Sequence, residues 1–556
     1  MRLARGSARV LAVGTGLCAA AAAYKHETDE GARRTFKAYA AFLPVVAHYR
    51  AVEFRHKLQP PSADAASDEW RALDRRYAAP SVAVLGELGG MYAKYGQTAA
   101  GLTNTLSDGW VQELRKLEDQ VPPRPAAVVR QTILEETGRE PEQIFASFDP
   151  TPLGSASIGQ VHRATLLDGR EVAVKVQYPD SERLFRSDMK AIRGFFQLVA
   201  PENLFQLDAL EKQNALELDY TIEAANLSLI HGNMSRHGFL PREVAVPLPV
   251  AGLSTRRMLV MQLLPGPKLV DGLRRYGAIA AAREGKTLEQ LEVEMRARFE
   301  DGFVPAKYEG PSAGTIAAYL RLMRARDFLL NVAVGLYNVS LGWTAGRATY
   351  VESCLPPNAP RVIDTLMRVH GTQLLADGVF NADPHGGNFL MLPDDRIGLI
   401  DFGATKHLTE KERIGACVMF AALHRRDEQM MIDMAQVSGY KSKYGKKEVL
   451  MKLMQFGYDS WGKDVTGGKN LVQFIDDLKA IDPWEEVPDN FVMCQFMTIR
   501  LRALALALNH PITVSDYWGP IALEVLRREG LPYEKWDKDM LIKYKPEMNM
   551  QKYKFA

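Results

Sequence analysis

Three residues with oxygen-bearing side chains lie near one another in the second half of the sequence. Asp383 and Asn388 stand at the two ends of the run DPHGGN, and Asp401 opens the run DFG a little farther on. Carboxylate and amide oxygens are hard ligands of the kind that Mg²⁺ binds. Any one of them could instead be a helix cap or a turn residue. Taken together, they predict a magnesium site.

A single lysine interrupts an apolar run in the first half of the chain. Lys175 lies within Val172–Val176, VAVKV, a pattern that predicts a buried strand. A buried ammonium group requires a carboxylate partner or an anionic ligand. Glu217 and Glu223 lie six residues apart on the helical stretch that follows, so they project from different faces of a helix. We expect one of these two glutamates to be the partner of Lys175.

Small residues crowd the entry to the strand pair that carries this lysine. In the stretch GSASIGQV two glycines flank an alanine, at the place where protein kinases carry GxGxxGxV over the phosphates of ATP. The alanine, Ala156, replaces the middle glycine, narrows the space above the phosphates and stiffens the turn. The candidate nucleotide-binding residues are Gly154, Ser155, Ala156, Ser157, Gly159, Val161 and Lys175.

The elements around these residues follow the order of a two-lobed kinase. Two β-rich runs flank Asp168–Gly169, which is a strong hairpin signal; a long helical stretch, about 183–236, comes next, and one buried strand, Arg257–Leu264, follows. The second half is mostly helical, with a small hairpin between DPHGGN and DFG. We predict an α+β, protein-kinase-like fold with a small β-rich N-lobe and a mostly helical C-lobe.

In such a fold the polar residues acquire roles. Protein kinases set a catalytic-loop aspartate five residues before a metal-binding asparagine, a spacing that makes Asp383 the candidate catalytic residue and Asn388 a metal ligand. Asp401, in DFG, is the expected second metal ligand. Lys175 is expected to hold the phosphates of the nucleotide.

Four motifs resemble the UbiB family of atypical kinases, which includes the aarF-domain kinases. They are KxGQ at Lys94–Gln97, the small-residue nucleotide loop at Ser155–His162, ExD at Glu217–Asp219, and the DPHxGN catalytic loop within Ala382–Asn388. The resemblance covers roughly residues 85–530. The combination of KxGQ with DPHxGN is highly specific to this family.

The resemblance implies ATP and Mg²⁺ as cofactors and assigns further roles. It makes Lys175 the phosphate anchor and Glu223 its catalytic helix partner. It also implies a regulatory lid, an N-terminal extension that folds over the active site where a protein substrate would otherwise enter. The lid residues are Lys94, Gly96 and Gln97, and the residues that they meet are Glu217 and Asp219. A lysine that faces two carboxylates would clamp a partly dry cleft.

Three positions depart from the family pattern. Asn381 stands where histidine is frequent, Gly386 where proline is common, and Gly154 where alanine is frequent. These departures leave the metal ligands in place, but they leave the nucleotide preference open.

Composition narrows the classes of function. The chain has 556 residues, of which 47% are hydrophobic and 24% charged, as in an ordinary globular protein. A formal net charge of +2 provides no basic field for nucleic acid, and the four widely separated cysteines indicate neither a zinc site nor a disulfide framework. The expected partners are a nucleotide, a membrane lipid or quinone-like small molecule, and quinone-biosynthesis proteins, with no nucleic acid.

The N-terminus indicates a destination. It is basic, has no acidic residue before Glu27, and contains an apolar run, Val10–Tyr24, that is too short to span a bilayer. This pattern resembles an organelle transit peptide, and a secretory signal is the alternative. We expect a mitochondrial protein associated with the inner membrane, with the plastid as second choice. Residues 33–57 could lie on a membrane surface or form a helix packed on the body.

The predicted organisation has five parts. They are 1–67, a targeting and membrane-proximal segment that ends in a linker at Gln59–Ser67; 68–147, the helical KxGQ extension; 148–266, the N-lobe; 267–535, the C-lobe with an insertion at about 272–360; and 536–556, a tail. Within the insertion, Thr315–Trp343 predicts one long apolar helix. We expect this helix to be buried, with a membrane segment as the alternative.

The sequence after DFG bears on the reaction. Thr405–Leu408 leads straight into a predicted helix, with no APE motif. Kinases that phosphorylate proteins need an activation segment between DFG and APE to align the acceptor. The leading hypothesis is therefore an atypical kinase or ATPase that binds ATP with Mg²⁺ and performs ATP hydrolysis or small-molecule phosphotransfer. The resemblance implies a supporting role in ubiquinone or other prenyl-quinone metabolism at a membrane. The alternatives are a protein kinase whose lid opens on a membrane or partner, and a non-catalytic scaffold that binds nucleotide.

Overall fold

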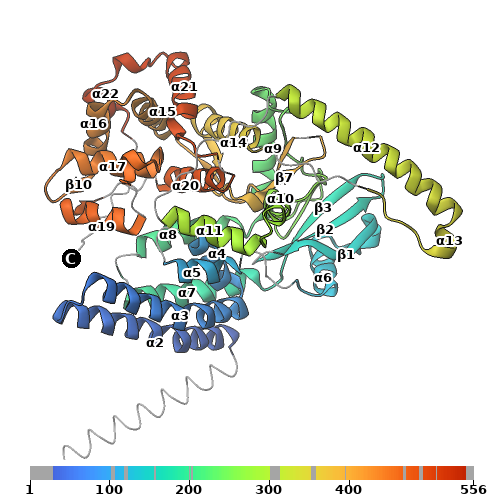
Figure 1. Cartoon of the computed structure of the whole chain (residues 1–556), viewed down its shortest axis with the longest axis horizontal. Helices are drawn as coiled ribbons and strands as arrows, with labels where there is room; N and C mark the ends of the chain where they lie inside the picture. The colour runs from blue at the N-terminus through green and yellow to red at the C-terminus, as the bar shows by residue number, and fades with distance from the viewer. Residues whose placement is uncertain are drawn as a thin grey trace, which may run out of the picture.

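The protein has the predicted two-lobed α+β kinase-like architecture. The computed structural model describes residues 29–101, 107–117, 123–155, 158–199, 201, 204–300, 313–351, 358–394, 396–467, 471–486, 492–508 and 510–545. A small β-sheet lies on one side, the helices of the C-lobe lie on the other, and a layer of N-terminal helices runs along the bottom of the view in Figure 1.

The N-lobe sheet is antiparallel, with the strand order β1-β2-β3-β5. Its strands are β1 (Phe145–Ser155), β2 (Gly159–Leu166), β3 (Glu171–Gln177) and β5 (Met258–Gln262). The hairpin predicted at Asp168–Gly169 is confirmed as the β2–β3 turn, where Gly169 has a φ of 89°. The register sets Val161 opposite Gly154 on one side and opposite Lys175 on the other. Lys175 is therefore held in an inner strand of the sheet.

Three helices, rather than one long stretch, connect β3 to β5. They are α7 (Ser181–Val199), α8 (Leu204–Leu216) and α9 (Tyr220–Arg236). The predicted helical stretch over about 183–236 is thus confirmed as helical, and it is divided among three helices. Its second break is the turn at Glu217–Asp219, because Asp219 accepts a hydrogen bond from the Thr221 backbone N–H at 3.0 Å and caps α9. Glu223 consequently lies in the first turn of α9.

The N-terminal helices pack on one another and on α7. They are α2 (Glu30–Leu58), α3 (Ala63–Leu88), α4 (Gly90–Gly101) and α5 (Asp108–Arg115). Residues 33–57 therefore form a helix packed on the body, fixed by Arg34, which binds both carboxylate oxygens of the buried Asp188 at 2.8 and 2.6 Å. The predicted linker Gln59–Ser67 is wrong in its second half, because Ser62 caps α3. The predicted targeting run Val10–Tyr24 lies outside the described residues.

The next helix, α6 (Ala126–Thr137), packs on the sheet and ends at Gly138, which has a φ of 68°. The left-handed backbone of this glycine closes the helix.

The C-lobe is mostly helical. Its helices are α10 (Leu269–Arg283), α11 (Leu288–Glu300), α14 (Ala359–Thr372), α15 (Glu410–Arg425), α16 (Glu428–Ser438), α17 (Lys447–Tyr458), α18 (Lys463–Thr466), α19 (Leu471–Ile481), α20 (Val492–Ala507), α21 (Val514–Arg528) and α22 (Lys538–Lys543). The predicted tail is wrong for its described part, because Trp536 and Leu541 are buried in the C-lobe core.

Short strands and turns connect these helices. They are β4 (Val244–Ala245), β6 (Val379–Asn381), β7 (Phe389–Met391), β8 (Ile397–Leu399), β9 (Thr405–His407), β10 (Lys441–Ser442), β11 (Trp484–Glu486), the π-helical turn η3 (Gln373–Asp377), η4 (Gly386–Asn388) and η5 (Tyr533–Lys535). The turn η1 (Pro141–Gln143) lies instead between α6 and β1. The predicted second hairpin is confirmed as β7–β8, which β4 extends in parallel, while β6 pairs with β9. The DPHGGN segment therefore lies between β6 and β7, and DFG lies between β8 and β9.

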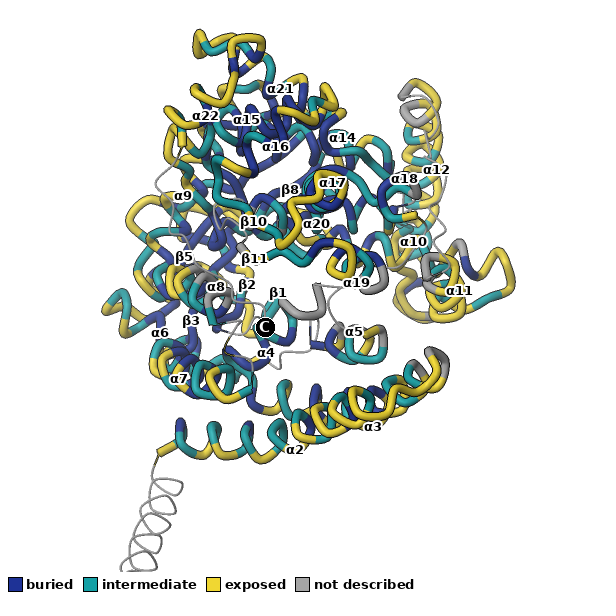
Figure 2. Tube along the Cα trace, turned by 90° about the vertical axis from the view of Figure 1, so that its left-hand side faces the viewer, coloured by how far each residue is buried: buried dark blue, intermediate teal, exposed yellow. Residues whose placement is uncertain are grey.

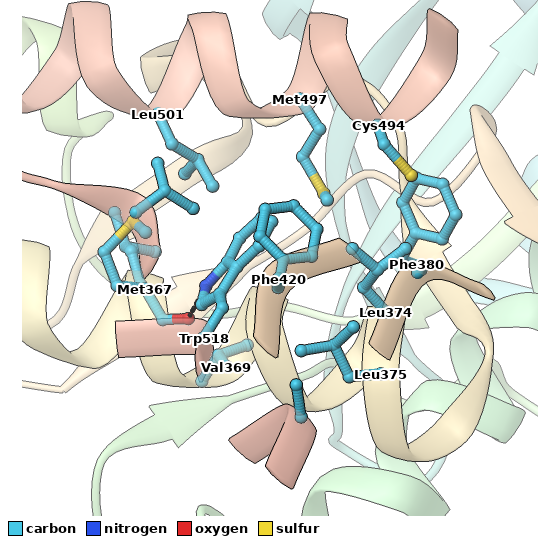
Figure 3. Close-up of a cluster of buried hydrophobic side chains, with 14 of the residues drawn as sticks. Met367, Val369, Leu374, Leu375, Phe380, Phe420, Cys494, Met497, Leu501 and Trp518 are labelled. Atoms are coloured by element: carbon cyan, nitrogen blue, oxygen red, sulfur yellow. Dashed lines mark hydrogen bonds between the residues drawn. The ribbon is translucent and has the colours of Figure 1, made fainter. Parts of the chain in front are cut away.

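A large aromatic residue organises the core of the C-lobe. Trp518 of α21 is fully buried, donates its indole N–H to the Met367 carbonyl at 2.8 Å, and packs edge-to-face against Phe420 at 4.8 Å (Figure 3). Met497 and Leu501 of α20 reach into the same cluster. Burial of such side chains contributes about 1.5–3 kcal/mol each. This cluster fixes α20 beside the strand that precedes the catalytic loop.

The insertion is where the structure departs most from expectation. The predicted helix at Thr315–Trp343 exists as α12 (Ala313–Ser340) followed by α13 (Gly342–Ala345). The expectation that it is buried is wrong, because most of its large apolar side chains are exposed. Figure 1 shows α12 standing apart from the β-sheet, with α13 at its outer end. Among the described helices, none is long and apolar enough to cross a membrane.

Candidate active site

Lys175 and two carboxylates from distant parts of the chain meet between the lobes. The Lys175 ammonium donates to both carboxylate oxygens of Glu223, at 2.9 and 2.8 Å, and lies 3.7 Å from an oxygen of Asp401. The side chain of Glu223 is only 3% exposed and that of Lys175 is 16% exposed, whereas the side chain of Asp401 is 39% exposed. Of the two candidate partners for Lys175, the structure selects Glu223. The open side of Asp401 is the side from which a ligand can reach the cluster.

The charges of this cluster are coupled. Burial lowers the pKa of Lys175, but the carboxylates of Asp401 and Glu223 outweigh it and hold that pKa well above its ordinary value. Burial raises the pKa of Glu223 to about 7, although Lys175 acts in the opposite direction. Burial would also raise the pKa of Asp401, yet Lys175 and the Gly403 N–H keep it below its ordinary value. At neutral pH, Lys175 is thus a cation beside an ionised Asp401.

The DFG segment is fixed from two sides. Phe402 is buried in the C-lobe core, and its carbonyl accepts the side-chain amide of Asn226 at 3.1 Å. Asn226 stands one turn beyond Glu223 on α9. On the other side, Asn381 donates its amide to the Asp401 carbonyl at 2.9 Å. The helix that carries the lysine's partner and the strand before the catalytic loop therefore both hold Asp401 in place.

The catalytic loop is tied to the same point. The oxygen of Asn381 accepts the Asp383 N–H at 2.8 Å, and the Asn388 amide donates to the Asp383 carbonyl at 3.1 Å. The carboxylate of Asp383 pairs with the guanidinium of Arg500 on α20. Because the Asn388 amide nitrogen is engaged inside the loop, its oxygen is the atom left to face a metal. Asp383, Asn388 and Asp401 are thus brought together, and Asn381 connects the two loops.

The nucleotide loop is anchored at both ends. The Ser155 hydroxyl lies 2.9 Å from the Tyr178 hydroxyl, which donates to the Gln160 side chain at 3.1 Å. A Cβ at Gly159 would lie 2.5 Å from the Val176 carbonyl oxygen, so only glycine fits, whereas a Cβ at Gly154 would meet nothing closer than 3.9 Å. Val161 lies between Gly154 and Lys175 in the sheet register. The other two loop candidates, Ala156 and Ser157, lie outside the described residues.

Lys94 is the residue of the predicted lid motif that contacts the carboxylates of the site. Lys94 of α4 pairs with Glu217. Glu217 lies beside the cluster at Gly403: a Cβ built on this glycine would be 3.5 Å from the Glu217 Cγ. The same Cβ would be 3.5 Å from a carboxylate oxygen of Asp401 and 3.6 Å from one of Glu223. The second predicted carboxylate, Asp219, caps α9 through one of its oxygens.

The rest of the KxGQ motif serves packing. Gln97 donates to the Leu117 carbonyl at 2.8 Å, and Gly96 leaves room for the Leu117 side chain, which a Cβ there would approach to 2.5 Å. Only Lys94 of the motif therefore reaches the site, while Gly96 and Gln97 hold α4 against the end of α5.

Some contacts of the site were not predicted from the sequence. Asn226 follows Glu223 at a spacing of three, a signal that helix geometry offers. Tyr178 directly follows β3 and could have been suspected from its place beside the loop. Arg500 has no local signal, because its partner lies in another part of the chain and α20 carries several similar apolar and basic residues.

Comparison with known proteins agrees with this geometry. The model of the ABC1 atypical kinase-like domain matches residues 116–306 and 356–435. AarF domain-containing protein kinase 1 of Gallus gallus is 30% identical over 256 residues, which cover 45% of this chain and 48% of the relative. The chloroplastic protein ACTIVITY OF BC1 COMPLEX KINASE 8 of Arabidopsis thaliana is 36% identical over 359 residues, 62% of this chain and 36% of the relative.

A solved structure, the complex of Rv3197 with erythromycin from Mycobacterium tuberculosis, matches 80% of this chain and 97% of its own with a TM-score of 0.38 and 20% identity. The chain spans about half the length, or less, of the relatives named above. The matched segments contain the ammonium, the carboxylates and the asparagine of the site, from Lys175 to Asp401. The chain therefore belongs to the UbiB family of atypical kinases and carries their ABC1 kinase-like domain.

Proposed function

We propose that this protein binds ATP with Mg²⁺ in the site around Lys175 and uses it for ATP hydrolysis or for phosphotransfer to a small molecule. The observation that carries the proposal is the convergence of Lys175, Glu223 and Asp401 within 3.7 Å, next to the loop that bears Asp383 and Asn388. An ammonium, two carboxylates and an asparagine from both lobes form the arrangement that phosphoryl transfer requires.

The donor set fits a magnesium ion that is bound together with phosphates. Within the described ranges, no three side chains of the His, Cys, Asp or Glu type form a cage for a metal ion. Mg²⁺ ordinarily binds one or two protein oxygens plus phosphate oxygens and water. Asp401 and the Asn388 oxygen can supply the protein share. Lys94, Lys175, Glu217, Glu223 and Asp401 together carry one more carboxylate than ammonium, and a divalent cation would offset this excess charge.

Each residue of the site then has a task. Magnesium neutralises phosphate charge when it is bound. Lys175, fixed by Glu223, is placed to hold phosphate oxygens. Asp383 would orient the acceptor, water or a hydroxyl, and would receive its proton as the acceptor oxygen bonds to the γ-phosphorus and the bond from that phosphorus to the oxygen of ADP breaks. Asn381 keeps the Asp383 and Asp401 backbones in register.

The connection after DFG supports a small acceptor. From Gly403 the chain enters β9, which pairs with β6, and the Leu408 N–H donates to the Gly378 carbonyl at 2.7 Å before α15 begins at Glu410. This short connection is committed to strand pairing and to the capping box of α15. It leaves little chain to align a peptide acceptor.

The test is a measurement of ATP turnover and of nucleotide-induced thermal shift with Mg²⁺. We expect the wild type to gain several degrees in Tm with Mg·ATP by mass action and to release phosphate. Asp401→Asn should lose turnover at least about a hundredfold, because a metal-binding carboxylate is removed. Asp394→Asn is the matched control, since that aspartate lies on the β7–β8 turn and pairs with Arg396. Turnover that survives Asp401→Asn would overturn catalysis and favour a nucleotide-binding scaffold.

A second candidate function is protein phosphorylation after the lid opens. It is favoured by one observation: the ion pair of Lys94 with Glu217, which links the extension to the site, is partly open to solvent, since both side chains are about one-fifth exposed. Lys94→Ala would then allow transfer of labelled phosphate from ATP to added proteins, whereas the exposed control Lys116→Ala would not. Absence of transfer with both variants, on a background of intact ATP turnover, would leave the small-molecule reaction as the function.

We also propose, from the family, a role in ubiquinone or other prenyl-quinone metabolism at a membrane, in the mitochondrion, with the plastid as the alternative. The Arabidopsis relative is named as chloroplastic, which supports an organelle but not which one. Fractionation of cells that express the full chain with a C-terminal tag tests the location. Recovery in the cytosolic fraction would contradict it.

A further inference from the structure

One long helix of the protein is almost uncovered. Among the described elements, α12 packs closely only against its own continuation, α13. Arg324 ties it to the body by a hydrogen bond to the Pro393 carbonyl at 3.3 Å. Figures 1 and 2 show α12 at the margin of the molecule, with much of its tube coloured as exposed in Figure 2. The helix falls in 307–355, the gap between the two segments that match the family model. The family resemblance therefore does not explain α12.

The outer half of α12 is apolar on more than one face. From Phe328 to Trp343 the sequence contains no charged residue. Leu329 and Leu336 are each 68% exposed, and Val339 and Trp343 are each 79% exposed. A contiguous apolar surface of this kind marks an interaction site, whereas single exposed leucines do not. Phe328, Leu329 and the next residue are all exposed and point about 100° apart, so the apolar surface covers more than one face of the helix.

The polar groups of this half are used internally. The Asn331 amide exchanges two hydrogen bonds with the backbone of Val351, at 2.9 and 2.6 Å, and Asn338 does the same with Ala348, at 2.9 and 2.7 Å. The Ser340 hydroxyl donates to the carbonyl of Leu336 at 2.7 Å. The two asparagines therefore bind the returning chain to the helix. What α12 presents to its surroundings is hydrocarbon.

Positive charge flanks the apolar half at both ends. Arg321, Arg324 and Arg326 precede it, and Arg347 follows it, with its guanidinium 5.9 Å from the Trp343 ring. Among the described residues of 313–351 the only acidic one is Asp327, which pairs with Arg326 at 2.9 Å. Arginines on either side of an apolar segment that ends in tryptophan match the headgroup region of an anionic bilayer.

We propose that α12 and α13 form a membrane-docking arm that inserts its Phe328–Trp343 half into the interface of an anionic lipid bilayer. A lipid phase covers all faces of a helix at once, whereas a partner helix covers one stripe. A second copy of this chain would also bring the same arginines together. Interfacial insertion agrees with the finding that α12 does not qualify as a membrane-spanning helix. The inference is independent of the nucleotide site.

The test uses the full chain and vesicles of phosphatidylcholine with about a quarter cardiolipin or phosphatidylserine. The variant Leu329→Glu/Leu336→Glu/Val339→Glu should bind them about tenfold or more weakly than the wild type, since three apolar side chains that would insert into the bilayer become charged. The matched control is Leu167→Glu/Leu198→Glu/Ile542→Glu, which alters leucine and isoleucine residues elsewhere that are also more than half exposed, and changes the net charge by the same amount. It should bind like the wild type.

A second readout does not depend on destabilising changes. In vesicles that contain brominated lipid, the fluorescence of the wild type should be quenched more than that of Trp343→Phe, and the difference reports Trp343 alone. An unquenched Trp343 would overturn the proposal even if the N-terminal segment held the protein on vesicles. A different outcome would also overturn the proposal: the wild type is a dimer in lipid-free solution, and the α12 variant is a monomer whereas the control remains a dimer. In that case a second copy of the chain, and not a bilayer, would cover α12.

Discussion

The guanidinium of Arg500 pairs with the carboxylate of Asp383, so a helix near the end of the chain contacts the residue expected to orient the acceptor. The helix in question, α20, is fixed by Met497 and Leu501, which lie within one turn of Arg500 and pack in the C-lobe core. The catalytic loop therefore depends on the packing of a distant part of the C-lobe.

Replacing Arg500 by glutamine should loosen that loop. We expect a coupling energy of about 0.5–1.5 kcal/mol between Arg500→Gln and Asp383→Asn in a double-mutant cycle of urea unfolding, because both side chains are partly exposed and solvent screens the pair. The exposed pair Arg527 with Glu524 is the control, and Arg527→Gln should show coupling near zero with Asp383→Asn. Strict additivity of Arg500→Gln with Asp383→Asn would show that the pair does not contribute to stability.

Asn381 should be needed to hold the catalytic loop and the DFG segment together. Asn381→Ala leaves the Asp383 N–H and the Asp401 carbonyl without their hydrogen-bond partner. Each unsatisfied buried group lowers the free energy of unfolding by about 1–3 kcal/mol. We expect a lower Tm and the loss of most of the thermal shift that Mg·ATP induces, since Asp401 is no longer held. Asn381→His, which introduces the residue frequent in the family, should recover part of that shift. A normal nucleotide shift in Asn381→Ala would rule out this bridging role.

The two outer glycines of the nucleotide loop should respond differently to alanine. At Gly159 the new methyl group would meet the Val176 carbonyl oxygen at 2.5 Å and the Tyr220 hydroxyl at 2.8 Å, so the backbone must shift at a cost of about 1–3 kcal/mol. At Gly154 the nearest atom is the Lys268 ammonium at 3.9 Å, so Gly154→Ala should be neutral or stabilising by up to about 1 kcal/mol. Thermal unfolding of the two variants side by side checks this. Equal effects would contradict the loop geometry.

Local patterns and motif spacing predicted much of the kinase-like body. Turn residues marked the β2–β3 hairpin, and the single lysine in an apolar strand led to a carboxylate partner, although the family resemblance, and not the local pattern, chose Glu223 over Glu217. The spacing of Asp383, Asn388 and Asp401 placed three groups that the structure brings together. These signals are readable because turns, strand alternation and loop spacing are properties of neighbouring residues.

The failures concern what lies next to a segment in space. The apolar content of α12 predicts burial, but the sequence does not say what covers the helix. Asp219 carries the same carboxylate as Glu217, and only the start of α9 decides that it is a cap. The partner of Asp383, Arg500, comes from a helix whose packing is set by the C-lobe core. Each of these depends on tertiary contacts that no local pattern records.

A buried histidine should make the C-lobe sensitive to acid. His370 is fully buried beneath the catalytic loop, edge-to-face with Phe389 at 5.8 Å, and its Nδ1 lies 2.8 Å from the Leu366 carbonyl. Burial lowers its pKa from 6.5 to about 4. Between these values the unfolded chain binds more protons than the folded one, so the stability is complete above about pH 6.5 and falls by about 3 kcal/mol as the pH drops towards 4. His370→Leu, which keeps the helix and the apolar packing, should unfold in urea with a shallower loss of free energy between pH 7 and 5 than the wild type. Parallel pH profiles for the two proteins would show that His370 is not the group that titrates.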